Sequence, residues 1–134
     1  MKNGIVTRGV LYDIPRLKGL PYLEPGTRIT VNDLEAWEER AGVKVGPGDA
    51  FFVRWGRWAR QDVVGPFDTG LESAGLDNNV IPWLRERDVA VAGWETPGYA
   101  PQPKGDLSRV ALHNFALTIL GLQVLDRADF QALA

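Results

Sequence analysis

The feature that most constrains this chain is a repeated succession of one helix and one short apolar strand. The residue pattern predicts a helix over 30–41, capped by Thr30 and ended by Gly42, and a buried strand follows at 50–54. A second helix is predicted over 78–87, and a second buried strand follows at 88–93. Helix and strand alternating twice in this way predict an α/β fold with a mixed sheet covered by helices.

The rest of the chain predicts fewer regular elements. Between residues 56 and 78 the signals are poor, and they predict a long loop with at most a short turn of helix. The remaining predictions are strands at 4–12 and 122–125, loops at 19–28 and 96–106, a helix at 108–120 and the start of a helix at 128–134. A chain of 134 residues fits one domain, which we take to span residues 1–134.

Composition excludes several classes of site and partner. The chain has no cysteine, so it has no disulfide, no thiolate metal site and no cysteine nucleophile. Its formal net charge of -2 provides no basic surface for nucleic acid or for anionic lipid. No apolar window approaches the length of a signal peptide core or a membrane span, so we expect a cytoplasmic protein without a membrane partner.

The one histidine, His113, is the first candidate for a metal ligand, and Asp126 is the second. His113 lies on the predicted helix over 108–120, and Asp126 directly follows the next predicted strand. A tight connection between the two elements brings both side chains to one edge of the sheet. Imidazole and carboxylate suit Zn²⁺ or Mn²⁺, but zinc prefers three or four protein ligands. A packed histidine and an aspartate that caps the following helix are the alternatives.

Other candidate sites are weaker. The pair Trp55 and Trp58 lies among Arg54, Arg57 and Arg60, and this basic aromatic cluster either stacks an aromatic ligand or covers the core while its cations stay in water. Glu95 follows a predicted strand at a position where sheet proteins often place functional side chains. The chain has no phosphate-binding glycine loop and no nucleophile elbow around a serine, so we assign no catalytic residue.

Several segments, taken together, resemble the cyclase family of metal-dependent hydrolases, which includes bacterial kynurenine formamidase and isatin hydrolase. The resemblance begins with the run Gly-Ile-Val-Thr-Arg-Gly-Val-Leu-Tyr-Asp-Ile-Pro-Arg-Leu-Lys-Gly at residues 4–19. It continues, in the family's order and spacing, through the segments at 29–35, 47–49, 54–56, 82–90, 112–113, 120–126 and 132–133. It therefore covers essentially the whole chain.

The resemblance implies a swivelling β/β/α fold and a bound Zn²⁺ or Mn²⁺ that activates water for attack on an amide or formamide carbonyl. It matches His113 and Asp126 to residues associated with a second metal position. The family's early ligand motif, His-x-Gly-Thr-His-x-Asp, does not occur in this chain. We therefore expect a single partial domain, truncated at both ends.

The resemblance also marks departures near the expected substrate pocket. Trp55 stands where the family usually has threonine, Trp94 where it has serine, and Arg127 where asparagine commonly follows the acid. Together with Glu95, the two tryptophans are our candidates for the lining of a substrate pocket. Their bulk argues against ordinary substrate binding.

These observations lead to one functional expectation and two alternatives. The resemblance implies an arylformamidase-like enzyme of tryptophan catabolism, which converts the aromatic amide N-formylkynurenine to kynurenine, and we expect little or no such activity from this chain. The first alternative is a non-catalytic, truncated family member that forms a homo-oligomer as a binding or assembly module. The second is a gene or expression fragment with no independent role.

Overall fold

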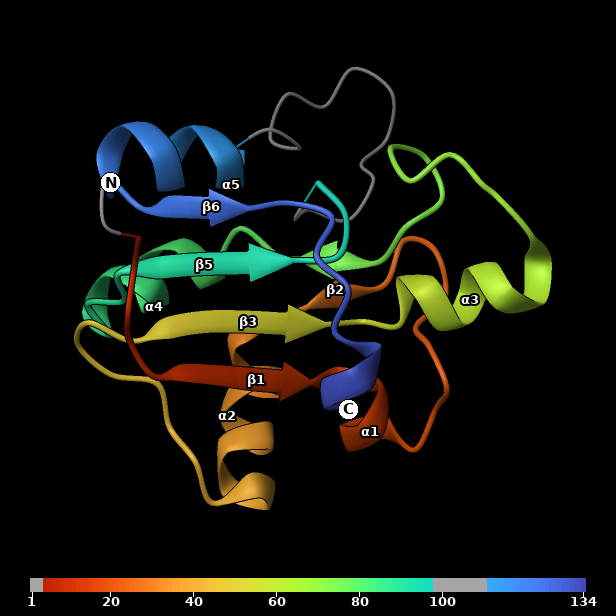
Figure 1. The fold of residues 1–134 in the computed structure, drawn as a ribbon, viewed down its shortest axis with the longest axis horizontal. Helices are drawn as coiled ribbons and strands as arrows, with labels where there is room; N and C mark the ends of the chain where they lie inside the picture. The colour runs from red at the N-terminus through yellow and green to blue at the C-terminus, as the bar shows by residue number, and fades with distance from the viewer. Residues whose placement is uncertain (1–3, 98–110) are drawn as a thin grey trace.

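A computed structural model describes residues 4–97 and 111–134 of the chain. Four parallel strands form the main sheet in the order β1-β3-β5-β6, and β2 pairs in parallel with β4 in a separate small sheet (Figure 1). The strands are β1 Gly9–Asp13, β2 Arg28–Ile29, β3 Ala50–Arg54, β4 Gly75–Leu76, β5 Val91–Trp94 and β6 Gln123–Leu125. Every strand pair among the described residues is parallel, whereas the sequence pattern predicts a mixed sheet.

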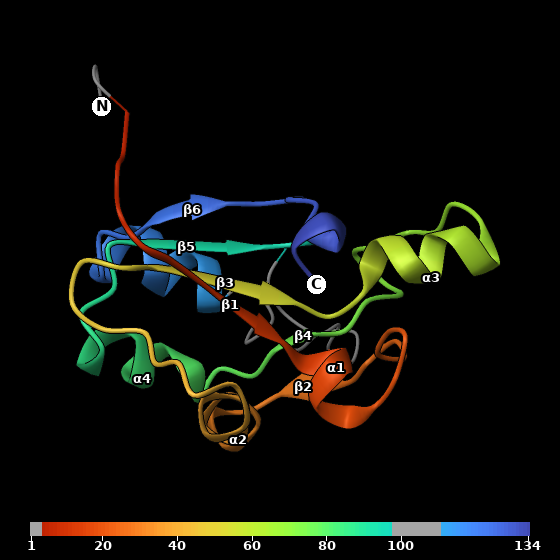
Figure 2. The same ribbon diagram turned by 60° about the horizontal axis from the view of Figure 1, so that its bottom comes forward.

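The helices are α1 Ile14–Lys18, α2 Val31–Ala41, α3 Arg57–Val64, α4 Val80–Glu86 and α5 Ala111–Asn114. A π-helical turn, Phe115–Ile119, continues α5, and a short 3-10 turn, Gln131–Leu133, lies near the carboxyl terminus. Helices α2 and α4 cover one face of the main sheet, and the terminal turn lies on the opposite side (Figure 2). The α/β fold class predicted from the sequence is confirmed.

The core under the helices is aromatic. Tyr12 of β1 and Phe51 of β3 lie side by side with ring centroids 4.9 Å apart, and Trp83 of α4 meets them at 6.0 Å and 5.6 Å. Tilted and edge-to-face rings at these distances are favourable beyond the area that they bury. Alternate residues of the parallel strands therefore point toward α4, and the residues between them point to the other face.

Helix α2 confirms the best local prediction. The carboxylate of Asp33 accepts the backbone N–H of Thr30 at 2.9 Å, which closes a capping box at the start of the helix. Gly42 ends it in the left-handed conformation, with φ 65°. Leu34 and Trp37 are buried, while Ala41, which we expected on the same face, is exposed.

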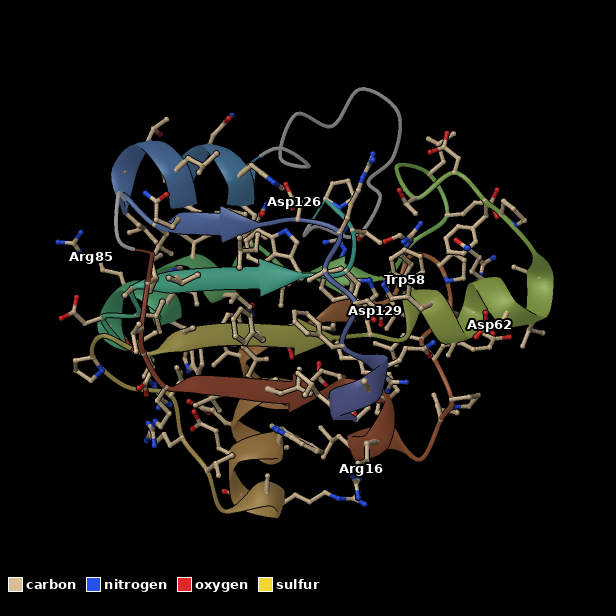
Figure 3. The ribbon with its side chains drawn as sticks, in the orientation of Figure 1. Arg16, Trp58, Asp62, Arg85, Asp126 and Asp129 are labelled. Carbon is tan, nitrogen blue, oxygen red and sulfur yellow. The ribbon has the colours of Figure 1, made fainter. Side chains whose placement is uncertain are left out.

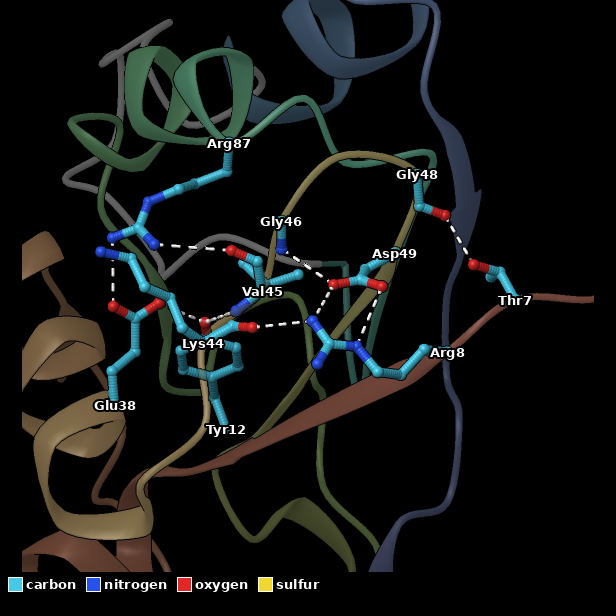
Figure 4. A network of polar contacts seen from close by, with 10 residues as sticks. All are labelled: Thr7, Arg8, Tyr12, Glu38, Lys44, Val45, Gly46, Gly48, Asp49 and Arg87. Carbon is cyan, nitrogen blue, oxygen red and sulfur yellow. Dashed lines mark hydrogen bonds and ion pairs between the residues drawn. The ribbon is translucent and has the colours of Figure 1, made fainter.

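The connection from α2 to β3 is held by a polar network (Figure 4). Tyr12 donates its hydroxyl to Glu38 at 2.7 Å and accepts the backbone N–H of Val45 at 3.2 Å. Arg87 binds the second oxygen of Glu38 at 3.1 Å. Burial, followed by the hydrogen bond to Glu38, raises the pKa of Tyr12 well above its ordinary value, so its hydroxyl remains a donor.

A second part of the network ties the same connection to the segment before β1. Arg8 forms an ion pair with Asp49 and donates to the carbonyl of Lys44 at 2.9 Å. Asp49 also accepts the backbone N–H of Gly46 at 2.8 Å. The hydrogen bond from Arg8, together with that from Gly46, holds the pKa of Asp49 below its ordinary value.

The prediction of a long loop over 56–78 is wrong, because α3 and β4 both lie within it. The expected strand at 4–12 is regular only from Gly9, and it runs directly into α1. The predicted helix at 128–134 is only the 3-10 turn. The predicted start of the helix over 108–120 and most of the predicted loop over 96–106 lie outside the described residues.

In the part of the chain that the structure describes, no helix has the length and apolar character needed to cross a membrane.

Candidate functional site

The carboxyl ends of the four parallel strands meet at one edge of the main sheet. Asp13 ends β1, Arg54 ends β3, Trp94 ends β5, and Asp126 directly follows β6. In Figure 3, Asp126 and Trp58 lie at this end of the sheet, and the labelled Arg85 lies at the other. Sheets of this kind place ligands outside the carboxyl ends of their strands, so this edge is the candidate site.

His113 and Asp126 come together here. The Nε2 atom of His113 lies 2.9 Å from Oδ2 of Asp126. The indole N–H of Trp94 donates to Oδ1 of the same carboxylate. The rings of Trp94 and His113 meet nearly edge to face, with centroids 5.7 Å apart. We call these three side chains the Trp94–Asp126–His113 cluster.

This cluster does not fit a zinc or manganese ion as it stands. Both oxygens of Asp126 are engaged by protein groups, and Nε2 of His113 faces a carboxylate oxygen. Within residues 4–97 and 111–134, no group of three or more histidine, cysteine, aspartate or glutamate side chains is placed to hold a metal. Zinc needs three or four protein ligands, so the pair alone makes an incomplete site. The metal-binding role of His113 and Asp126 stays a prediction.

The three residues predicted to line a substrate pocket are buried in the structure. Trp55 is 2% exposed, and Trp94 and Glu95 are fully buried. Oε2 of Glu95 accepts three backbone N–H groups, those of Trp55 at 2.7 Å, Gly56 at 2.7 Å and Arg57 at 3.1 Å. Burial raises the pKa of the Glu95 carboxyl above its ordinary value, although these three donors act in the opposite direction.

Part of the basic aromatic cluster makes contacts within the protein. The guanidinium carbon of Arg57 lies 3.7 Å from the centroid of the Trp58 ring, a cation–π contact between neighbours in sequence. Trp58 donates its indole N–H to the carbonyl of Ala128 at 3.0 Å, which ties α3 to the carboxyl-terminal segment. These contacts favour the structural alternative over the stacking of an aromatic ligand.

Sequence reasoning missed a buried ion pair at this edge. Arg54 binds Asp13 at 2.9 Å, and both side chains are at least nine-tenths buried. Asp13 also accepts the backbone N–H of Arg16 at 3.1 Å, which caps α1. An aspartate directly before Ile-Pro is an available sign of such a cap, but nothing local connects it to Arg54, which is 41 residues away.

A comparison with protein-family models identifies the family to which the chain belongs. The model of the Cyclase family matches residues 1–101, about three quarters of the chain. This chain belongs to the Cyclase family. The family predicted from the sequence is thereby confirmed. The matched region ends before His113 and Asp126, so it does not test their role.

Solved structures agree with the family. A novel cyclase of known crystal structure shares 25% sequence identity with this chain. The two structures superpose with a TM-score of 0.77 over 94% of this chain. An isatin hydrolase bound to the product analogue thioisatinate is 20% identical, with a TM-score of 0.70 over 96% of this chain. Isatin hydrolase A from Labrenzia aggregata, bound to benzyl benzoate, is 21% identical, with a TM-score of 0.66 over 90%.

The match covers only part of each relative. This Cyclase family chain spans 41% of the novel cyclase and 49% and 47% of the two isatin hydrolases, less than half of each. No curated protein matches the chain.

Proposed function

We propose that this chain is a partial Cyclase family hydrolase domain that has little or no arylformamidase activity by itself. Its family supports hydrolase chemistry, and isatin hydrolases are among its structural neighbours. The observation that carries the proposal is the closed Trp94–Asp126–His113 cluster, in which both oxygens of Asp126 already have protein partners. The substrate class that we propose is an aromatic amide, and the location that we propose is the cytoplasm.

Whether the chain can bind a catalytic metal distinguishes an active hydrolase from an inactive one. Zn²⁺ or Mn²⁺ would supply an activated water. His113 and Asp126 could bind the metal only if the hydrogen bonds that now close the cluster were broken. The chain has one histidine and no cysteine, so any complete site must draw on further carboxylates or on a further chain.

The test combines metal binding and turnover on the purified chain. We expect no stoichiometric Zn²⁺ or Mn²⁺ by calorimetry, and no hydrolysis of N-formylkynurenine or isatin above that of His113→Ala and Asp126→Ala. Asp129→Asn, which alters an acid three residues further on, controls for weak surface binding. Tight metal binding with turnover that both alanine variants abolish would contradict the proposed inactivity.

A second candidate function, self-association, is favoured by the sheet face away from α2 and α4. An apolar hollow of about 180 Å³ lies there, lined by Ile5, Thr7, Gly9, Ala50, Phe52, Val91 and Leu125. Ile5 and Leu125 are 46% and 52% exposed. Leu125 belongs to β6, an edge strand, and unpaired edges pair readily with another chain. Each copy has a formal net charge of only -2, so electrostatic repulsion between two copies is weak.

We expect light scattering after gel filtration to show a homodimer that Leu125→Lys converts to a monomer, because a buried lysine in an apolar contact loses its hydration. Leu71→Lys is the matched control, since Leu71 is 68% exposed and lies outside the hollow. A wild-type monomer at high micromolar concentration, or an unchanged dimer in Leu125→Lys, would overturn this candidate.

A further inference from the structure

Three successive backbone N–H groups converge where β3 passes into α3. Those of Trp55, Gly56 and Arg57 all point to Oε2 of Glu95, at 2.7, 2.7 and 3.1 Å. Glu95 reaches them because it directly follows β5, whose last residue, Trp94, pairs with Val53 of β3. A single carboxylate oxygen thus receives three donors from a turn that lies 38 to 40 residues away in the sequence.

The backbone of this turn has the form of an anion-binding nest. Gly56 is left-handed, with φ 85° and ψ 29°, and Arg57 begins α3. A left-handed residue next to a right-handed one aims successive N–H groups at a common point, and the positive end of the helix dipole adds to the attraction. Gly56 cannot be replaced easily, because a Cβ there would lie 2.6 Å from the Cα of Tyr22.

Several buried side-chain atoms of Glu95 and of residues 54–57 have no hydrogen-bond partner. Oε1 of the fully buried Glu95 has no hydrogen-bond partner, and neither do the buried Nε of Arg54, Nε1 of Trp55, or Nε and Nη1 of Arg57. Only one other such atom, Nε1 of Trp83, occurs within the described residues. The positive charges of Arg54 and Arg57 both act on the Glu95 carboxylate, so the surroundings of this buried group favour an anion.

We propose that the turn at residues 55–57 is a carboxylate-binding site that Glu95 fills from within the chain, and that a small free carboxylate takes this site once the Glu95 side chain is shortened. Glu95 is then a positioning residue. It supplies the cap that α3 lacks locally, and it keeps free carboxylates out of the turn. The inference holds whether or not the chain hydrolyses amides.

The test is rescue of Glu95→Ala by sodium formate. We expect this variant to melt roughly 5–10 °C below wild type, because three buried donors lose their acceptor. Formate should restore at least half of that loss with a saturable dose response, and should shift the amide NMR signals of Trp55, Gly56 and Arg57. Formamide, which has the same shape but no charge, and sodium chloride at equal ionic strength should do neither.

Three controls make the result decisive. Wild type and Glu95→Gln, whose side chain still fills the turn, should show no saturable response to formate. Glu39→Ala, which removes an exposed glutamate from α2, should melt as wild type does and ignore formate. If Glu95→Ala is unfolded in buffer, folding in formate but not in formamide supports the proposal. An equal response of wild type, or a variant that formate neither stabilises nor folds, overturns it.

Discussion

Asp13→Ala is expected to lower the free energy of unfolding by about 3–5 kcal/mol, because it leaves Arg54 as a buried charge without its partner. The Asp13 and Arg54 side chains are 4% and 10% exposed and lie 2.9 Å apart. The same substitution removes the cap of α1, which adds about 1 kcal/mol. Denaturation in urea, followed by tryptophan fluorescence, measures the loss.

Two further variants separate the ion pair from other effects of the substitution. Asp62→Ala changes an exposed aspartate on α3 and should leave the unfolding free energy within about 0.5 kcal/mol of wild type. The double variant Asp13→Ala/Arg54→Met should recover part of the loss, since no unpaired charge then remains buried. A loss below about 1 kcal/mol in Asp13→Ala would show that the pair does not have the buried character described above.

Gly56→Ala is expected to destabilise the protein by about 2–5 kcal/mol. A left-handed conformation costs an alanine roughly 1–2 kcal/mol, and overpacking adds about 1–3 kcal/mol. The overpacking arises because the new Cβ would meet the Cα and Cβ of Tyr22 at 2.6 Å and the carbonyl oxygen of Pro21 at 2.9 Å. Backbone atoms cannot move aside as the end of a flexible side chain can, so the turn itself must shift.

Gly42→Ala is the matched control for this prediction. Gly42 is also left-handed, with φ 65° and ψ 23°, but a Cβ there would meet nothing within 4 Å. Gly42→Ala should therefore lower the free energy of unfolding only by the cost of the left-handed conformation, about 1–2 kcal/mol. Urea denaturation of both variants gives the difference between them. Equal losses would mean that the contact with Tyr22 relaxes without cost.

The Cyclase family and helix α2 could be predicted from the sequence, because the motifs that indicate them lie within short segments of the chain. Thr30 and Asp33 close a capping box within four residues, and Gly42 ends the helix by its own backbone freedom. Short apolar runs indicated β3 and β5 for the same reason, since a strand buried on both faces needs apolar residues throughout.

Helix α3 could not be predicted in this way, and the reason is physical. Its first residues follow Gly56, which has no side chain to cap them, and none of its residues is buried. The acceptor for its first amides is Glu95, which reaches them only when β5 lies beside β3. Such a cap exists only in the folded chain.

The residues of the candidate site could be identified from the sequence, but their contacts could not. The sequence singled out His113, Asp126, Trp55, Trp94 and Glu95 one by one, from residue type, position after a strand and family resemblance. Only the tertiary structure set the indole of Trp94 against Asp126, and the carboxylate of Glu95 in the turn before α3. Residue types and local backbone preferences are determined by the sequence itself, whereas the partner of a buried polar group is decided by which strand ends the sheet brings together.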